Sequence, residues 1–186
     1  MKKPLLLIVL GVICWGLSAQ APPKNTFLSI GYIGQFAYQT GAKIGAQIDL
    51  NSWTNPNDRT LGKSWFVSPQ LGLVTRPEVH TSYLANVTIG IKRYRSQLYK
   101  YAAVSMGFGY LLESRILDRS INLSDGTDEK NREQRSWFIP TLNFEFGRPL
   151  NQQLGWYARF SGGPQIGAKG PTILTTFFEF GIHHAL

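Results

Sequence analysis

Histidine is scarce in this chain, which has three, and one of them lies in a stretch that could support nucleophilic chemistry. Residues 78–82 read EVHTS, so His80 and Ser82 are two positions apart. Two such residues on a strand share one side. A serine, a histidine and a carboxylate together are the groups that hydrolases use to activate a hydroxyl. The stretch therefore offers a candidate catalytic set of His80, Ser82 and Glu78, with an ordinary turn before a strand as the alternative.

Other motifs that carry chemistry are missing from the sequence. Residues 122–129 are rich in carboxylates, but their spacing does not match a calcium-binding EF-hand, so we expect a solvated loop. The chain contains no phosphate-binding loop, no dinucleotide fingerprint and no cysteine or histidine cluster for a metal ion. We therefore expect neither a cofactor nor a metal.

The first residues read as a signal peptide. Lys2 and Lys3 precede an apolar run at 5–15, which is shorter than the ~20 residues of a spanning helix. Small residues follow at 18–21, and we expect cleavage after Ala19. This divides the chain into a signal peptide, 1–19, and an exported domain, 20–186, without cysteine because Cys14 leaves with the signal. An N-terminal membrane anchor is the alternative interpretation.

The formal net charge of +8 could indicate a nucleic-acid partner. Export argues against nucleic acid and favours anionic lipid head groups as the counter-charge. Several basic residues could meet such head groups or simply be solvated, and we expect them near the inner rim of the barrel that is predicted below. They are Arg59, Lys63, Arg93, Arg95, Lys100 and Arg148.

Residues 172–186 alternate between an apolar side and a mixed, partly charged side, as expected for a strand with one face against apolar surroundings. Similar short segments recur between turn residues, at 27–37, 42–50, 65–74, 82–94, 101–112, 137–147, 154–166 and 173–186. After the signal, no apolar run approaches the ~18 residues of a spanning helix. The pattern predicts an all-β fold, an antiparallel up-and-down transmembrane β-barrel of about eight strands.

The predicted strands assign each residue to the lipid or to the barrel interior. The residues we expect to face lipid include Leu142, Phe144, Phe146, Trp156, Phe160, Phe178, Phe180 and Ile182. Two prolines, Pro69 and Pro140, lie inside strands, where each costs a ladder bond and is a candidate site for a bulge. We expect a long outer loop at 113–136 and an inner turn at 51–64.

The inward positions carry charges of both signs in equal number. The polar interior network that we expect comprises Lys43, Lys92 and Arg159 with Asp49, Glu145 and Glu179. An eight-stranded barrel is just wide enough for side chains to fill, and an unpaired charge there would cost several kcal/mol. The sequence predicts a packed, ion-paired plug; a narrow ion path is the alternative.

The pattern as a whole resembles small outer-membrane barrels of the Bacteroidetes type. The stretches that carry the resemblance are 41–45, 65–72, 85–94, 107–111 and the terminal strand 178–186. The resemblance implies a bacterial outer-membrane location, contact with its lipids, assembly by the insertion machinery that reads the last strand, and no cofactor. Leu186 and His184 depart from the usual terminal signal. A larger outer-membrane protein complex is a candidate partner.

Three functions follow from these patterns. The first is a non-enzymatic barrel that supports the envelope or docks onto other outer-membrane components. The second is a rim-site lipid A hydrolase, because His80 and Ser82 resemble the pair that barrel-borne lipid A deacylases carry on the outer surface near the rim. The third is a soluble lipocalin-like carrier, which would hold Phe178, Phe180 and Ile182 inside a calyx.

Overall fold

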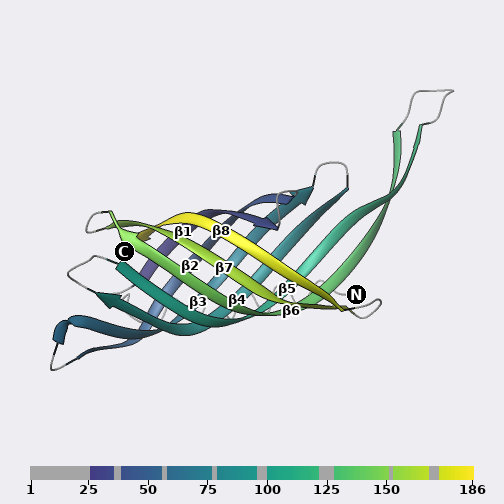
Figure 1. Ribbon diagram of the computed structural model, residues 1–186. Coiled ribbons are helices and arrows are strands. Elements are labelled where there is room, and N and C mark those ends of the chain that lie inside the picture. Colours follow the sequence, from purple (N-terminus) through teal and green to yellow (C-terminus); the bar gives the residue numbers. More distant parts are fainter. Residues whose placement is uncertain are drawn as a thin grey trace, which may run out of the picture.

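Eight strands make up the part of the chain that the computed structural model describes, residues 26–35, 39–55, 58–76, 79–95, 100–121, 128–150, 153–167 and 172–186 (Figure 1). The strands are β1 (Thr26–Gln35), β2 (Gln39–Asn55), β3 (Asp58–Arg76), β4 (His80–Arg95), β5 (Lys100–Ile121), β6 (Asp128–Pro149), β7 (Leu154–Gly167) and β8 (Ile173–Ala185). The predicted signal peptide, Glu78 and residues 122–127 lie outside the described residues. No described helix is long and apolar enough to span a membrane.

The strands form one closed ring in sequence order. Each strand pairs antiparallel with the next, and β1 closes the ring on β8 from Phe27 opposite Ala185 to Gly34 opposite Phe178. Closure leaves no sheet edge along the wall of the ring. The prediction of an all-β, up-and-down antiparallel barrel of about eight strands is confirmed.

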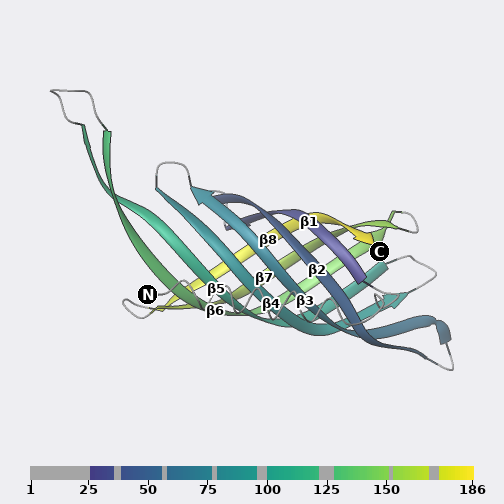
Figure 2. The ribbon, with the colours of Figure 1, turned by 180° about the vertical axis from the view of Figure 1, so that it is seen from behind.

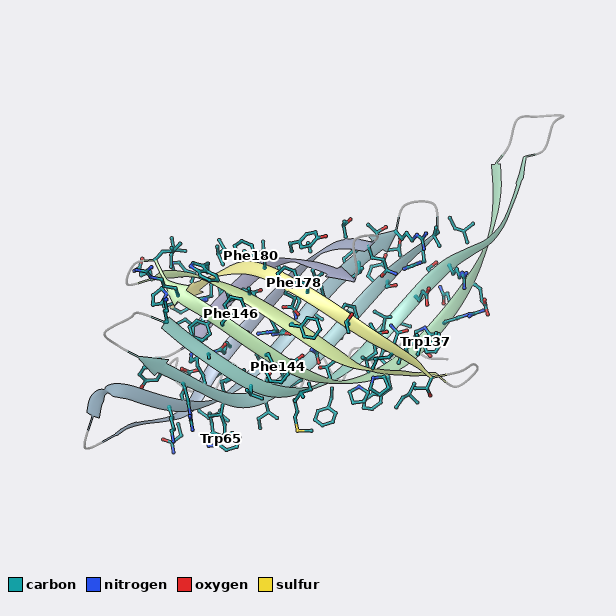
Figure 3. The ribbon with its side chains drawn as sticks, viewed as in Figure 1. Trp65, Trp137, Phe144, Phe146, Phe178 and Phe180 are labelled. Atoms are coloured by element: carbon teal, nitrogen blue, oxygen red, sulfur yellow. The ribbon has the colours of Figure 1, made fainter. Side chains whose placement is uncertain are left out.

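Alternation along each strand separates two sets of side chains. On β6, Phe144 and Phe146 are exposed, while Asn143 and Glu145, which alternate with them, are buried. The outside of the ring is therefore apolar and the inside holds charges, the reverse of a water-soluble barrel. Figure 3 labels Phe144, Phe146, Phe178 and Phe180 along the strands of this wall.

Both prolines interrupt hydrogen bonding without changing the register. Between β2 and β3 the ladder breaks off after Gly45 opposite Gln70 and resumes at Ile48 opposite Val67, on either side of Pro69. The β6–β7 ladder likewise skips the positions around Pro140. Proline has no N–H to donate. The expected loss of ladder pairing is found, and the expected bulges are not; the register shifts lie elsewhere, for example between Ile116 and Asp118.

Two hairpins are longer than the sequence suggested. The expected outer loop at 113–136 is mostly strand, because β5 continues to Ile121 and β6 starts at Asp128. The expected inner turn at 51–64 is likewise a hairpin of β2 and β3. Both predictions were wrong because mixed polar residues can pair as a two-stranded ribbon without the apolar alternation that marks a buried strand.

The two ends of the barrel differ. One end carries the extended β5–β6 hairpin, whose two strands continue beyond those of the other hairpins at this end (Figures 1 and 2). We call it the ribbon end, and we call residues 117–121 and 128–136 the ribbon. At the other end, the terminal end, the N–H of Leu186 donates to the carbonyl oxygen of Thr26 at 2.9 Å.

Glycines bring β1 and β8 close at the seam that closes the ring. Gly31 lies opposite Gly181, and both face the interior beneath Tyr157. A Cβ on Gly31 would lie 2.8 Å from the Tyr157 hydroxyl, and one on Gly181 would lie 2.7 Å from the Gly31 Cα. Only glycine fits such close approach.

Candidate functional site

The centre of the barrel interior holds four charged side chains, which we call the ionic quartet: Lys43, Glu145, Arg159 and Glu179. Arg159 lies directly between its two carboxylate partners, because Glu145 on β6 and Glu179 on β8 are opposite it. Its Nε donates to Glu145 Oε2 at 2.6 Å, and its Nη1 lies 3.5 Å from Glu179 Oε2. Lys43, on β2, forms an ion pair with Glu179. The quartet carries two charges of each sign and is buried throughout.

A second ion pair lies toward the terminal end. Lys92 Nζ is 3.0 Å from Asp49 Oδ2, and Gln47 and Ser64 donate to the same carboxylate at 3.0 Å and 3.4 Å. The ammonium also lies 4.7 Å from the centroid of the Phe27 ring, a cation–π arrangement. The structure thus pairs all six charged residues assigned to the interior.

Tyr101 links these two groups of charges. Its hydroxyl donates to Glu145 Oε1 at 2.9 Å, and its ring lies 5.6 Å from Lys92 Nζ. His183 packs beside Tyr101 and Tyr157. Aromatic rings therefore fill the space that the charged side chains leave at this end.

Between the ionic quartet and the ribbon end, one level of the interior is apolar. Seven buried side chains from six strands pack together there, and we call them the apolar layer: Ile33, Val74, Leu84, Leu111, Trp137, Ile139 and Phe177. This layer was not predicted. Its members sit beside outward apolar residues, as Trp137 does beside Phe138, so two-residue alternation of polarity is lost there.

A small cavity separates the apolar layer from the ionic quartet. Its volume is about 10 Å³, and its lining includes Ile139, Phe177, Asn86, Thr141 and Glu179. A space of that size holds about one water molecule. The cavity is therefore too small to serve as a ligand pocket.

The candidate catalytic residues lie inside the barrel, near the ribbon end. Ser82 faces the interior with 4% of its surface exposed, and it lies opposite Glu113 on β5. His80 Nδ1 is 3.8 Å from Glu113 Oε1, and the indole N–H of Trp137 donates to Glu113 Oε2 at 3.1 Å. Among the described residues, no hydrogen bond joins His80 to Ser82.

This placement corrects the hydrolase prediction. A rim-site hydrolase needs its serine on the outer surface, where lipid lies, and Ser82 is buried on the inner one. The carboxylate that the structure brings beside these residues is Glu113 on β5, which was not among the predicted site residues. Arg95 lies opposite Lys100 across the β4–β5 turn, and the same register places Ser82 opposite Glu113. The position of that turn in the sequence could therefore have predicted Glu113 as a neighbour of Ser82.

The residues expected to face lipid are on the outside. Phe178, Phe180 and Ile182 are 51%, 52% and 46% exposed. Aromatic rings contact one another across the strands, since Trp156 meets Phe146 edge to face and stacks on Phe180. A lipocalin-like carrier would hold the three β8 side chains inside a calyx, so that prediction is wrong. Within the described residues, no cluster of histidine, cysteine or acidic side chains suits a metal ion.

The geometry defines a closed eight-stranded barrel with an apolar outer wall and an ion-paired interior. It is similar to the N-terminal β-barrel domain of OprF from Pseudomonas aeruginosa, with a TM-score of 0.53 and 13% identity over 87% of this chain and 96% of that one. It also aligns with Ail, the attachment invasion locus protein of Yersinia pestis, with a TM-score of 0.47 and 12% identity over 87% and 99% of the two chains. At these identities the OprF likeness shows the fold alone.

Sequence comparison adds nothing to this likeness. No protein-family description matches the chain, and no curated protein matches it.

Proposed function

We propose that this chain is a non-enzymatic β-barrel of the bacterial outer membrane, with a closed interior, that acts as a structural or accessory subunit of the envelope. The observation that carries the proposal is the inverted distribution of polarity. Large apolar side chains on all eight strands are exposed, while Lys43, Glu145, Arg159 and Glu179 are buried. Only a surrounding of hydrocarbon makes that exposure favourable, and a closed barrel satisfies its backbone there.

The closed interior supports a structural role over a transport role. The ionic quartet fills the centre, and the apolar layer fills the interior between the centre and the ribbon end. The four charges of the quartet are paired with one another, so they leave no free carboxylate or ammonium at the centre to attract a permeating ion. We therefore infer that the barrel is a packed cylinder.

The ribbon supports the docking part of the proposal. In the described structure, residues 117–121 of β5 pair only with β6, and residues 128–136 of β6 pair only with β5. Unpaired strand edges bind further polypeptide readily. Under this proposal residues 1–19 are a cleaved signal, and the insertion machinery folds residues 20–186 into the membrane.

Membrane fractionation tests the location. The chain should remain in outer membranes that are washed with carbonate or urea, because hydrocarbon contact holds it there. Release into the wash would contradict the proposal. Recordings of single channels in planar bilayers should show no steady conductance, and a steady conductance would contradict the closed interior.

Affinity purification from gently solubilised outer membranes tests docking. A variant in which a short turn replaces residues 117–136 should lose partner proteins that the intact chain retains. Arg76→Gln, which lies near the ribbon end but outside the ribbon, is the matched control. Retention of every partner by the shortened variant would remove the ribbon from the docking surface.

A further inference from the structure

The outer wall carries a group of exposed basic side chains at the terminal end. We call Lys63, Arg93, Lys100 and Arg148 the basic arc. Each shares the outward face with apolar residues of its own strand, as Lys63 does with Trp65 and Arg148 does with Phe146. The arc thus lies directly beside the apolar wall. The side chains of Arg59 and Arg95 are not among those described.

The members of the basic arc are neighbours across strands. Lys63 on β3 lies opposite Arg93 on β4. Lys100 begins β5, and Arg148 lies one residue beyond Gly147, the residue paired with Tyr101. Four adjacent strands, β3 to β6, therefore present basic side chains at one level of the barrel.

The arc is of a single sign. No acidic residue occurs in residues 93–102 or 146–158, and no described carboxylate pairs with a member of the arc. Like charges gathered without partners repel one another, so an anion beside them would stabilise this arrangement.

Among the described side chains, the opposite rim lacks such a group. Its outward positions near the ribbon end carry hydroxyl and amide side chains, namely Thr75, Thr81, Ser114, Gln134 and Ser136. Two exposed arginines at that end, Arg76 and Arg115, belong to the inward-facing set of their strands and not to the outer wall. They lie on either side of His80. The two levels where the wall would meet water therefore differ in charge.

Aromatic side chains mark the same level as the basic arc. Trp156 lies opposite Arg148, and Trp65 lies two residues from Lys63 at the terminal end (Figure 3). Tryptophan prefers the boundary between hydrocarbon and head groups. Basic side chains just beyond such a belt are at the depth of lipid phosphates.

We propose that the basic arc binds the phosphate groups of anionic phospholipids in the leaflet at the terminal end. The proposal rests on the membrane location argued above. It goes further, because a barrel can insert into a bilayer without any preference among head groups. Each basic side chain near an anionic surface contributes about a fivefold preference, so the arc should concentrate anionic lipid beside Trp65 and Trp156.

Tryptophan quenching by lipids that carry bromine on their acyl chains tests this directly. The mature chain is inserted into vesicles of phosphatidylcholine that contain an equal fraction of brominated phosphatidylglycerol or brominated phosphatidylcholine. The wild type should be quenched more by the brominated phosphatidylglycerol. Lys63→Gln combined with Arg93→Gln should remove most of that difference, and Arg76→Gln combined with Arg115→Gln, the matched control at the ribbon end, should preserve it.

Two results would overturn the proposal: equal quenching of the wild type by both lipids, or equal loss in the control variant. Absence of quenching by either lipid would instead show that the chain did not insert, which contradicts the membrane location. A salt series on the wild type needs no variant, and the preference should vanish at about 1 M sodium chloride, where screening extends over about 3 Å. Stronger competition by inorganic phosphate than by chloride at equal ionic strength would indicate a site for free anions and would also overturn it.

Discussion

The ionic quartet and the apolar layer fill the same cylinder by opposite means. The quartet consists of long charged side chains that satisfy one another, so each depends on its partners. The apolar layer consists of side chains that need only close packing. Both are buried to a similar degree, since Glu179 and Ile139 are 2% and 1% exposed. Burial alone therefore does not tell what a residue contributes.

The difference lies in how each region responds to the loss of one member. A buried charge that loses its partner remains costly, whereas an apolar residue that is shortened leaves a cavity whose walls can relax. We expect the quartet to be the more sensitive to single changes and the more tolerant of balanced ones.

The largest effect is expected for Arg159→Met. Glu145 and Glu179 would lose their shared partner, and the quartet would be left with one excess negative charge. The free energy of unfolding should fall by about 3–5 kcal/mol, as measured by urea titration of the barrel in phospholipid vesicles. Arg76→Met, which removes an exposed arginine near the ribbon end, is the control and should change the free energy little. Equal losses in the two variants would remove the central role of the quartet.

Ile139→Ala tests the apolar layer. The side chain contributes to the wall of the small cavity, so its truncation should enlarge that cavity and cost about 3 kcal/mol. The same titration checks the value. Ile91→Ala, on the outer wall, should cost less because the lipid can fill the space it leaves. A larger loss from Ile139→Ala than from Arg159→Met would reverse the ranking of the two regions.

The sequence predicted one of these regions and missed the other. Lys43, Arg159 and Glu179 are charges set within apolar strands, and the period of two assigned them inward. Leu111 and Phe177 stand next to Leu112 and Phe178, so both faces are apolar and the pattern gives no direction. The outer wall was predictable from alternation, whereas the ribbon was not, because its backbone pairing leaves no polarity pattern.

The candidate site shows a second limit of the sequence. His80 and Ser82 were placed on a common side correctly. Alternation back from Lys92, an inward position of the same strand, assigns that side to the interior, and the hydrolase hypothesis did not take this into account. The partner carboxylate, Glu113, is distant in sequence and becomes a neighbour only through the register of β4 and β5. The register of two paired strands depends on where the turn between them lies. Alternation of polarity alone does not give the position of the turn between β4 and β5.

Tyr101→Phe should cause a loss of stability smaller than that of Ile139→Ala, and it tests a neutral partner of the quartet. It removes one hydroxyl that donates to Glu145 while keeping the ring beside Lys92. Hydrogen bonds to charged groups contribute about 1.5–3 kcal/mol, and Arg159 still holds the carboxylate, so a loss of about 1.5 kcal/mol is expected in the urea titration. Tyr110→Phe, which alters a hydroxyl on the exposed wall, should be close to neutral. No loss in Tyr101→Phe would mean that the quartet does not depend on its neutral partner.

The smallest effect is expected for the double variant Lys43→Met with Glu179→Met. The two changes remove one charge of each sign, and Arg159 keeps its pair with Glu145, so the interior stays balanced. Replacement of a whole buried ion pair by apolar side chains is often neutral, and we expect a change within about 1 kcal/mol. Glu179→Met alone should be far more costly, because Lys43 would then remain buried without its partner. If the double variant loses as much as the single one, the lost packing rather than the unpaired charge sets the cost, and the quartet would then behave like the apolar layer.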